Sequence, residues 1–255
     1  MTSAPEAPGR AQAMVLAAGR GERMRPLTDY KPKPLLEVRG RPLLQWHLDA
    51  LARAGWRRAL VNTAWLDEQI PARFGTRWFP QPETWLELGY SMEARDFGSA
   101  LETAGGIVRA LPRLDELFWV VAGDVFVPGF DFPAAAMQRF AASGKLAHLW
   151  LVPNPVHNPK GDFGLSEDGL ALNLPPDHGV PRHTYSTIGL YRREFFLAPH
   201  CDIPAGNPHG IAAPLAPLLR AAMDAGQVSA ELWRGDWTDV GTPERLAALN
   251  QEIFG

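Results

Sequence analysis

The chain of 255 residues has one cysteine, no long apolar run and little net charge. Because Cys201 stands alone, no internal disulfide and no paired-cysteine zinc site can form, which agrees with a reducing cytoplasm. No run approaches the roughly 18 apolar residues of a membrane-spanning helix, so no membrane partner is expected. A net charge of -3 gives the molecule no net positive potential that would attract nucleic acid. The cations of this chain must therefore act locally.

Residues 1–12 are rich in alanine, proline and glycine and lack the apolar core of a secretory signal, so a flexible leader is expected there. Residues 13–255 suit a single domain, because a chain of this length buries most of its apolar surface without covalent staples. No linker divides it, and no internal repeat or hexapeptide-repeat tail is visible. A monomer or a weak dimer is expected.

Short apolar segments alternate with amphipathic ones along the chain. Strands are predicted at 14–18, 58–63, 85–92, 118–122, 147–152, 185–191 and 228–232, with a hairpin of 163–165 and 171–174. Helices are predicted at 42–54, 67–74, 103–111, 213–225 and 243–254. Such alternation is typical of parallel βαβ units with right-handed crossovers. We expect a Rossmann-like, three-layer α/β fold with a mixed, mostly parallel sheet and a small substrate-covering lobe at about 150–190.

A glycine-broken, cation-rich loop follows the first predicted strand. It reads LAAGRGERMRPLT over residues 16–28, and KPKPL follows at 31–35. Gly19 and Gly21 let the chain turn sharply and bring bare backbone N–H groups to phosphate oxygens. Five cations would neutralise the anion: Arg20, Arg23, Arg25, Lys31 and Lys33. The third small residue of a dinucleotide-binding G-x-G-x-x-G turn is absent, which argues against NAD or FAD. The loop predicts a polyphosphate site, the alternative being a solvated basic turn.

Two carboxylates come at the ends of predicted strands. Asp124 directly follows the strand 118–122, at the edge where an open α/β sheet binds ligands. Asp239 lies in the segment WTDVGTPE, a short strand that leads into a helix with Thr242 as its N-cap. Mg²⁺ takes one or two carboxylates together with phosphate oxygens. Beside the phosphate loop, this pair predicts a magnesium site; either aspartate alone is equally well a turn or cap residue.

Together these motifs resemble the signature of sugar-1-phosphate nucleotidyltransferases, from about residue 13 to the C-terminus. The resemblance implies that an oxygen of a sugar 1-phosphate attacks the α-phosphorus of a nucleoside triphosphate, with Mg²⁺ as cofactor and pyrophosphate as leaving group. It implies catalytic roles for Arg23 and Lys33 and metal binding by Asp124 and Asp239. The implied nucleotide contacts are Ala18, Gly19, Gly21, Glu22, Arg23, Lys33, Glu102 and Gly105. The implied sugar-phosphate contacts are Asp162 and Asn154.

Three features resemble the small enzymes that make UDP-N-acetylmuramic acid from N-acetylmuramate α-1-phosphate in cell-wall recycling. They are the short chain without a C-terminal β-helix, LETAGGI at 101–107 and NPVHNPKGDF at 154–163. This resemblance implies UTP as the donor. The sequence departs from the pattern at Ala122, where asparagine is expected, and at Thr187, where glycine is usual. It also lacks the Glu-Lys-Pro segment by which many relatives hold the sugar phosphate, for which Lys160 is a candidate substitute.

Several alternatives stay open. The same chemistry serves mannose-1-phosphate guanylyltransferases, glucose-1-phosphate thymidylyltransferases and phosphocholine cytidylyltransferases. A different class of function is a catalytically silent binding protein on the same fold. Such a relative would be free to lose a reactive residue, whereas the four central ones are all present: Arg23, Lys33, Asp124 and Asp239. For Glu102 the alternative is helix capping, and for Asp162 it is a solvated hairpin residue.

Overall fold

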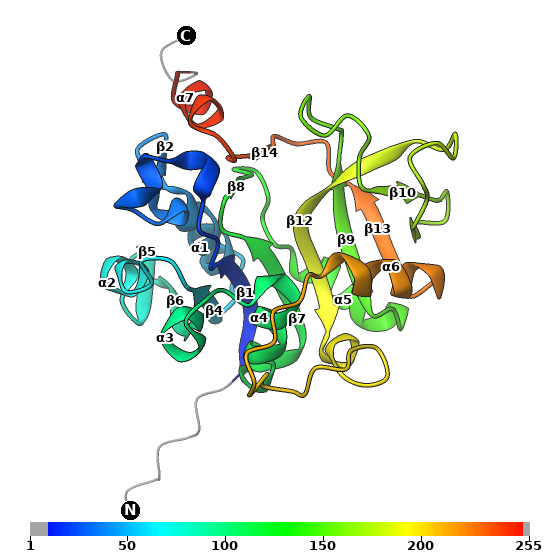
Figure 1. Ribbon diagram of the computed structural model, residues 1–255, viewed down its shortest axis with the longest axis horizontal. Coiled ribbons are helices and arrows are strands. Elements are labelled where there is room, and N and C mark those ends of the chain that lie inside the picture. The colour runs from blue at the N-terminus through cyan, green and yellow to red at the C-terminus, as the bar shows by residue number, and fades with distance from the viewer. Residues whose placement is uncertain (1–9, 252–255) are drawn as a thin grey trace, which may run out of the picture.

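The computed structural model describes residues 10–251 of the chain. Its strands form a ten-stranded sheet whose main path runs β11-β10-β12-β7-β1-β4-β6-β5; off this path, β9 pairs with β12, and β13 pairs with β9 (Figure 1). The bounds of these strands are β1 Ala11–Ala17, β4 Arg58–Thr63, β5 Arg77–Gln81, β6 Thr84–Met92, β7 Leu114–Ala122, β9 Ala147–Val152, β10 Phe163–Leu165, β11 Ala171–Leu172, β12 Arg182–Arg192 and β13 Val228–Leu232. Two shorter ladders pair β2 (Glu37–Val38) with β3 (Arg41–Pro42), and β8 (Val125–Phe126) with β14 (Thr238–Asp239).

The sheet is mixed but parallel at its centre. β1 pairs in parallel with β4 and β7, β4 with β6, and β9 with β13. β12 runs antiparallel to both β7 and β9, and its pairing with β9 shifts register between Tyr185 and Gly189. The predicted Rossmann-like, mostly parallel architecture is therefore confirmed. The parallel centre also gathers the carboxyl ends of β1, β4 and β7 at one edge, where α/β folds bind ligands.

Helices cover both faces of the sheet, which gives the three predicted layers. The helices are α1 Leu43–Arg53, α2 Gln69–Phe74, α3 Glu93–Phe97, α4 Glu102–Ala110, α5 Ala134–Ser143, α6 Ala216–Asp224 and α7 Pro243–Gln251. α7 lies apart from the large sheet and packs against β2. Along β1, alternate side chains enter opposite cores: Met14 packs with α4 and α6, whereas Val15 packs with α1 and α5. This alternation follows from the two-residue period of a strand. No helix in the described part of the chain is long and apolar enough to cross a membrane.

The structure corrects several predicted boundaries. β1 begins at Ala11, so the last two residues of the expected leader are strand, while residues 1–9 lie outside the described residues. α6 begins at Ala216 and not at 213. α5 was not predicted because it buries only Ala136 and Phe140, too few apolar positions for a clear helical period. The predicted lobe contains β10, which pairs with β12 at the right of Figure 1, and β11, which pairs with β10.

Candidate active site

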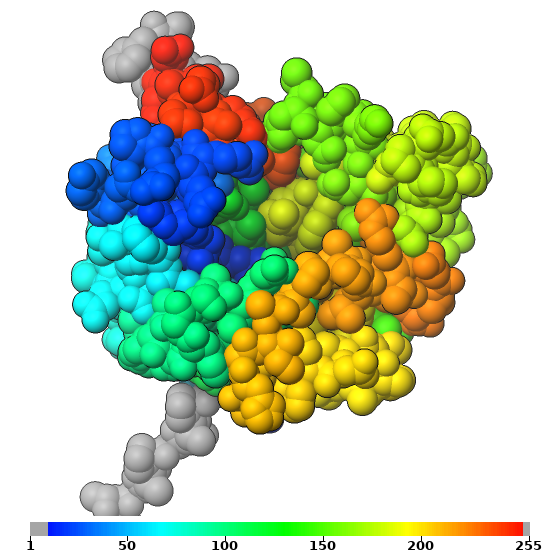
Figure 2. All heavy atoms as spheres, in the orientation of Figure 1, coloured from blue at the N-terminus to red at the C-terminus, as the bar shows by residue number. Residues whose placement is uncertain are grey.

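A cavity of about 660 Å³ opens at the carboxyl ends of β1, β4 and β7. Figure 2 shows it as a hollow between the blue N-terminal segment and the orange segment that contains α6. Six of the residues predicted for the site line it: Ala18, Gly19, Lys33, Glu102, Asp124 and Asp162. Gly21, Glu22, Arg23, Gly105, Asn154 and Asp239 do not belong to the lining.

The predicted phosphate loop, residues 16–35, is folded tightly around Gly21. This glycine has a φ of 67°, in the left-handed region, and precedes the 3-10 turn η1 (Glu22–Met24). A Cβ at this position would lie 3.0 Å from Cγ2 of Thr28 and 3.3 Å from Cβ of Lys33. The Thr28 hydroxyl donates a hydrogen bond to the carbonyl of Gly21 (2.8 Å). Glycine is therefore required here both by backbone conformation and by space.

The loop arginines divide into two groups. The guanidinium of Arg20 lies 3.4 Å from the centroid of the Trp65 ring, and Arg25 pairs with Asp29 (2.7 Å). These two cations support the loop itself. Arg23 is exposed and, within the described residues, has no hydrogen-bond or ion-pair partner. It is the loop arginine whose charge is available, and its predicted contact with the departing phosphates stays a prediction.

Lys33 and Asp124 form the central ion pair of the cavity. Lys33 is only 7% exposed, and its Nζ donates to Oδ2 of Asp124 at 2.5 Å across 91 residues of chain. Gly123 brings the aspartate there: its N–H donates to the carbonyl of Leu16 (2.8 Å), and a Cβ would lie 3.1 Å from that same oxygen. The ends of β7 and β1 thus approach closely, so that Asp124 meets the phosphate loop.

The second predicted metal residue reaches the same edge through a short ladder. β14 pairs antiparallel with β8, which places Asp239 opposite Val125, and the N–H of Val240 donates to the carbonyl of Asp124 (3.1 Å). Two segments 115 residues apart therefore meet here, with Asp239 on β14 and Asp124 just before β8. Their joint role in binding a metal stays a prediction.

Asp239 is paired with side chains of its own surroundings. Its Oδ2 accepts from Nη1 of Arg245 (2.7 Å), and Nε2 of His157 lies 3.4 Å from the same oxygen. A Cβ on Gly241 would come within 3.1 Å of both carboxylate oxygens, so the glycine keeps space open there. Among residues 10–251 no group of three or more histidine, cysteine or acidic side chains is arranged to hold a metal ion. Two carboxylates are a donor set that Mg²⁺ takes together with phosphate oxygens and water, whereas structural zinc prefers a closed set of side chains. The magnesium site stays a prediction.

A buried polar network that sequence reasoning missed lies beneath the cavity. Oδ1 of Asn62, at the end of β4, accepts from the N–H of Ala17 (2.8 Å), and its Nδ2 donates to Oε1 of Glu93 (2.7 Å). Oε2 of Glu93 accepts from the N–H of Leu101, just before α4 (2.8 Å). Burial raises the pKa of Glu93. The network fixes the start of α4 relative to β1 and β4; an asparagine inside the apolar strand RALVNT was the available signal.

Glu102 and Gly105, both predicted from the motif at 101–107 to contact the nucleotide, lie differently relative to the cavity. Glu102 lines the cavity, is exposed and has a φ of 56°, and α4 begins without a side-chain cap. Helix capping, the alternative, therefore does not account for it. Gly105 is buried inside α4, where a Cβ would lie 2.3 Å from the carbonyl oxygen of Ile211. Its lack of a side chain serves the packing of the 211–213 segment, and the structure does not bring it to the cavity surface.

The predicted sugar-side residues are tied into the lobe. Oδ2 of Asp162 accepts from the N–H of Tyr185 (2.8 Å), which positions this carboxylate in the cavity wall. Asn154 instead donates to the carbonyl of Arg182 (2.9 Å) and accepts from the hydroxyl of Thr184 (3.0 Å), so its polar atoms hold the loop together. Lys160 is exposed and does not line the cavity. The roles of Asp162 and Asn154 stay predictions.

The two departures from the family pattern, Ala122 and Thr187, both line the cavity. Thr187 lies at the register shift of β12 with a φ of 63°. This conformation is unfavourable for a β-branched residue and natural for glycine, which explains why glycine would suit the position. The threonine hydroxyl donates to the carbonyl of Ser186 (2.5 Å). A threonine side chain therefore lines the cavity on a strained backbone.

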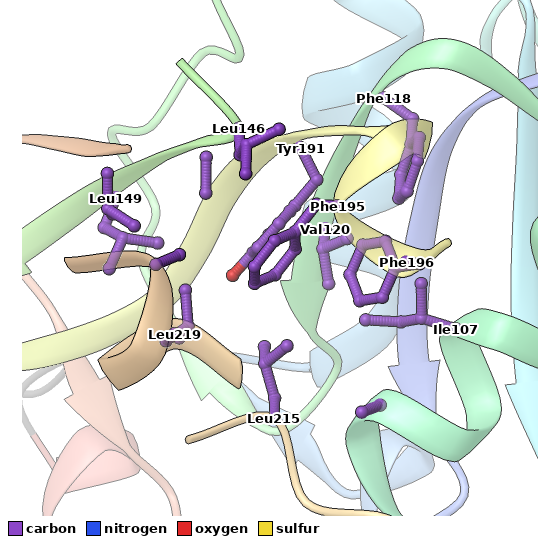
Figure 3. Close-up of a cluster of buried hydrophobic side chains, with 14 of the residues drawn as sticks. Ile107, Phe118, Val120, Leu146, Leu149, Tyr191, Phe195, Phe196, Leu215 and Leu219 are labelled. Carbon is purple, nitrogen blue, oxygen red and sulfur yellow. The ribbon is translucent and has the colours of Figure 1, made fainter. Parts of the chain in front are cut away.

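The wall contributed by α6 was not predicted to belong to the site. Leu215, Leu219 and Arg220 line the cavity there. In Figure 3 the two leucines point toward the aromatic cluster of Tyr191 and Phe195, so they form part of the core as well as of the cavity wall. This segment escaped sequence reasoning because its residues match no binding motif and reach the site only through the fold.

Comparison with known proteins identifies the family. The family model of the MobA-like NTP transferase domain matches residues 13–229. The chain belongs to the MobA-like NTP transferase family. It is 45% identical over 237 residues to the N-acetylmuramate α-1-phosphate uridylyltransferase of Neisseria meningitidis, which covers 92% of this chain and 95% of that relative. It is 31% identical to the enzyme of the same name from Caulobacter vibrioides, covering 92% and 94% of the two chains. The predicted membership of the sugar-1-phosphate nucleotidyltransferases is confirmed.

A solved structure of this MobA-like NTP transferase fold agrees at low sequence identity. A Bacillus anthracis protein described as a glucose-1-phosphate thymidylyltransferase, in complex with a sucrose, superimposes with a TM-score of 0.75. The superposition covers 94% of both chains, and the identity is 16%. This likeness confirms the predicted nucleotidyltransferase fold.

Proposed function

We propose that this protein transfers a uridylyl group from UTP to N-acetylmuramate α-1-phosphate, giving UDP-N-acetylmuramic acid and pyrophosphate. The observation that carries the proposal is the 45% identity to the Neisseria enzyme over 92% of this chain. The proposal is also supported by the ion pair of Lys33 with Asp124 in the cavity wall, next to the segment that contains Asp239. A role in cell-wall recycling, a cytoplasmic location and a monomer or weak dimer belong to the same proposal.

In the proposed reaction an oxygen of the sugar phosphate attacks the α-phosphorus of UTP. The bond between the α-phosphorus and the oxygen that bridges it to the β-phosphate breaks, and pyrophosphate leaves with the electron pair of that bond. No base is needed, because the attacking oxygen is already anionic. The protein has to align the two phosphates and offset their charge.

Lys33 is suited to this task because it is nearly buried. A cation in a poorly solvated cavity interacts with a phosphate more strongly than one in water. Its bond to Asp124 orients Nζ toward the cavity before the substrates bind. Arg23 and the backbone of residues 19–22 would hold the β- and γ-phosphates. Asp124 and Asp239 would hold Mg²⁺, which would neutralise charge on the reacting phosphates when bound.

The experiment is a pyrophosphate-release assay that crosses UTP, CTP, GTP, dTTP and ATP with several sugar 1-phosphates, with and without Mg²⁺. We expect the highest kcat/KM for UTP with N-acetylmuramate α-1-phosphate, and only with Mg²⁺. Asp124→Asn should abolish turnover, whereas Asp202→Asn, a matched change at an exposed aspartate, should not. Turnover only with GTP and mannose 1-phosphate would make the protein a guanylyltransferase. No turnover with any pair would leave a silent binding protein.

A further inference from the structure

The cavity has a second cationic position, on the wall formed by α6. Arg220 lines the cavity and is half-buried. Its Nη1 donates to Oδ1 of Asn173 (2.6 Å), and its guanidinium carbon lies 5.1 Å from the centroid of the Phe163 ring. Among residues 10–251 it has no carboxylate partner. The fold therefore holds a guanidinium in the ligand cavity without neutralising it.

Asn173 explains how the guanidinium is fixed while its charge is preserved. The asparagine Nδ2 donates to both oxygens of the exposed Asp224, at 3.0 and 3.1 Å. Its carbonyl oxygen is thereby turned toward Arg220. The acid orients the amide, and the hydrogen-bond partner that the guanidinium receives is the neutral amide, not the carboxylate. Since arginine has five N–H donors, most of them remain for a ligand.

An uncompensated cation in a ligand cavity favours an anionic group on the ligand, because partial desolvation of the cation is costly until it is paired. The reacting phosphates have their own cations on other elements: Lys33 in the 3-10 turn η3 (Lys33–Leu35), and Arg23 in η1. Arg220 is on α6, so it serves a different part of the substrate. A guanidinium also matches a planar carboxylate through two parallel hydrogen bonds.

We propose that Arg220 binds the carboxylate of the 3-O-lactyl group of the acceptor, and that it distinguishes N-acetylmuramate from N-acetylglucosamine 1-phosphate. This inference rests on the proposed function and names a specificity-determining residue for it. The two sugars differ only by the lactyl ether, so the carboxylate is the one charge by which a site can tell them apart. Beside Arg220, the apolar side chains of Phe163, Leu215 and Leu219 offer a surface for the lactyl methyl group.

The test measures KM for both acceptors at saturating UTP. Arg220→Met should raise KM for N-acetylmuramate α-1-phosphate about 10- to 100-fold, the loss expected for one charge-assisted pair. It should leave KM for N-acetylglucosamine α-1-phosphate and for UTP within about twofold. Arg220→Lys keeps the charge but loses the paired geometry, so it should give an intermediate KM. Arg53→Met, at an exposed arginine of α1, is the matched control and should change nothing.

The outcomes distinguish a failure of the inference about Arg220 from a failure of the proposed function. An equal rise in KM for both acceptors would show that Arg220 binds the shared phosphate or merely supports the wall, and it would overturn the inference. Unchanged KM values for both acceptors would overturn it as well. Absence of turnover by the wild-type protein with UTP and either acceptor would instead refute the proposed function, and the inference with it. Equal thermal unfolding midpoints of the wild type and the Arg220 variants check that the fold is intact.

Discussion

Gly21→Ala tests whether the predicted phosphate loop requires glycine at this position. Gly21 has a left-handed backbone conformation and also lies close to neighbouring side chains. A non-glycine residue at a φ of 67° costs about 1–2 kcal/mol. The new Cβ would also meet Thr28 at 3.0 Å and Lys33 at 3.3 Å, and overpacking of this kind costs about 1–3 kcal/mol. Neither neighbour can move freely, since Thr28 is fully buried and bonded to Gly21, and Lys33 is held by Asp124. The variant should lose about 2–5 kcal/mol of unfolding free energy.

Urea unfolding of Gly21→Ala and of two matched glycines separates the contributions. Gly40 has a φ of 73° but nothing within 4 Å of a new Cβ, so Gly40→Ala should lose only the conformational part, about 1–2 kcal/mol. Gly19 lies outside the left-handed region and also has open space, so Gly19→Ala should change stability by less than about 0.5 kcal/mol. If Gly21→Ala loses no more than Gly40→Ala, the close approach to Thr28 and Lys33 contributes nothing and the reasoning is wrong.

Two further substitutions test the site and its support. Lys33→Met should lower kcat by roughly 10²–10³-fold with an unchanged circular dichroism spectrum, because it removes the buried cation of the cavity; activity above a tenth of wild type would contradict this. Burial lowers the pKa of His47, which donates to the carbonyl of Val125, from 6.5 to about 4. The unfolded chain therefore takes up this proton first as pH falls from 6.5, and the folded state should lose about 3 kcal/mol by pH 4. Urea unfolding of His47→Gln should lack that part of the pH dependence; an identical dependence would contradict the assignment.

Local sequence patterns predicted the regular secondary structure of the fold well. The predicted strands 58–63, 147–152 and 228–232 coincide with β4, β9 and β13. β5 and α3 were missed. The side chains of β5 alternate between exposed and half-buried, and α3 spans five residues, too short for a helical period to show.

The residues of the candidate site also divide into those that a local sequence pattern predicts and those that it does not. Lys33 and Asp124 could be predicted because each stands in a motif, but their contact at 2.5 Å depends on β7 lying beside β1. Asn62 and Glu93 acquire their importance only when three elements meet, which no local pattern contains. The same holds for Arg220, whose place in the cavity follows from the packing of α6.

The central claim is tested most directly by following one reaction mixture with ³¹P NMR. The mixture contains the purified protein, UTP, N-acetylmuramate α-1-phosphate and Mg²⁺. The account predicts that the signals of UTP and of the sugar phosphate fall together, while a diphosphate-sugar product and pyrophosphate appear in equal amounts. Unchanged spectra, or hydrolysis of UTP to UMP without a sugar product, would contradict it.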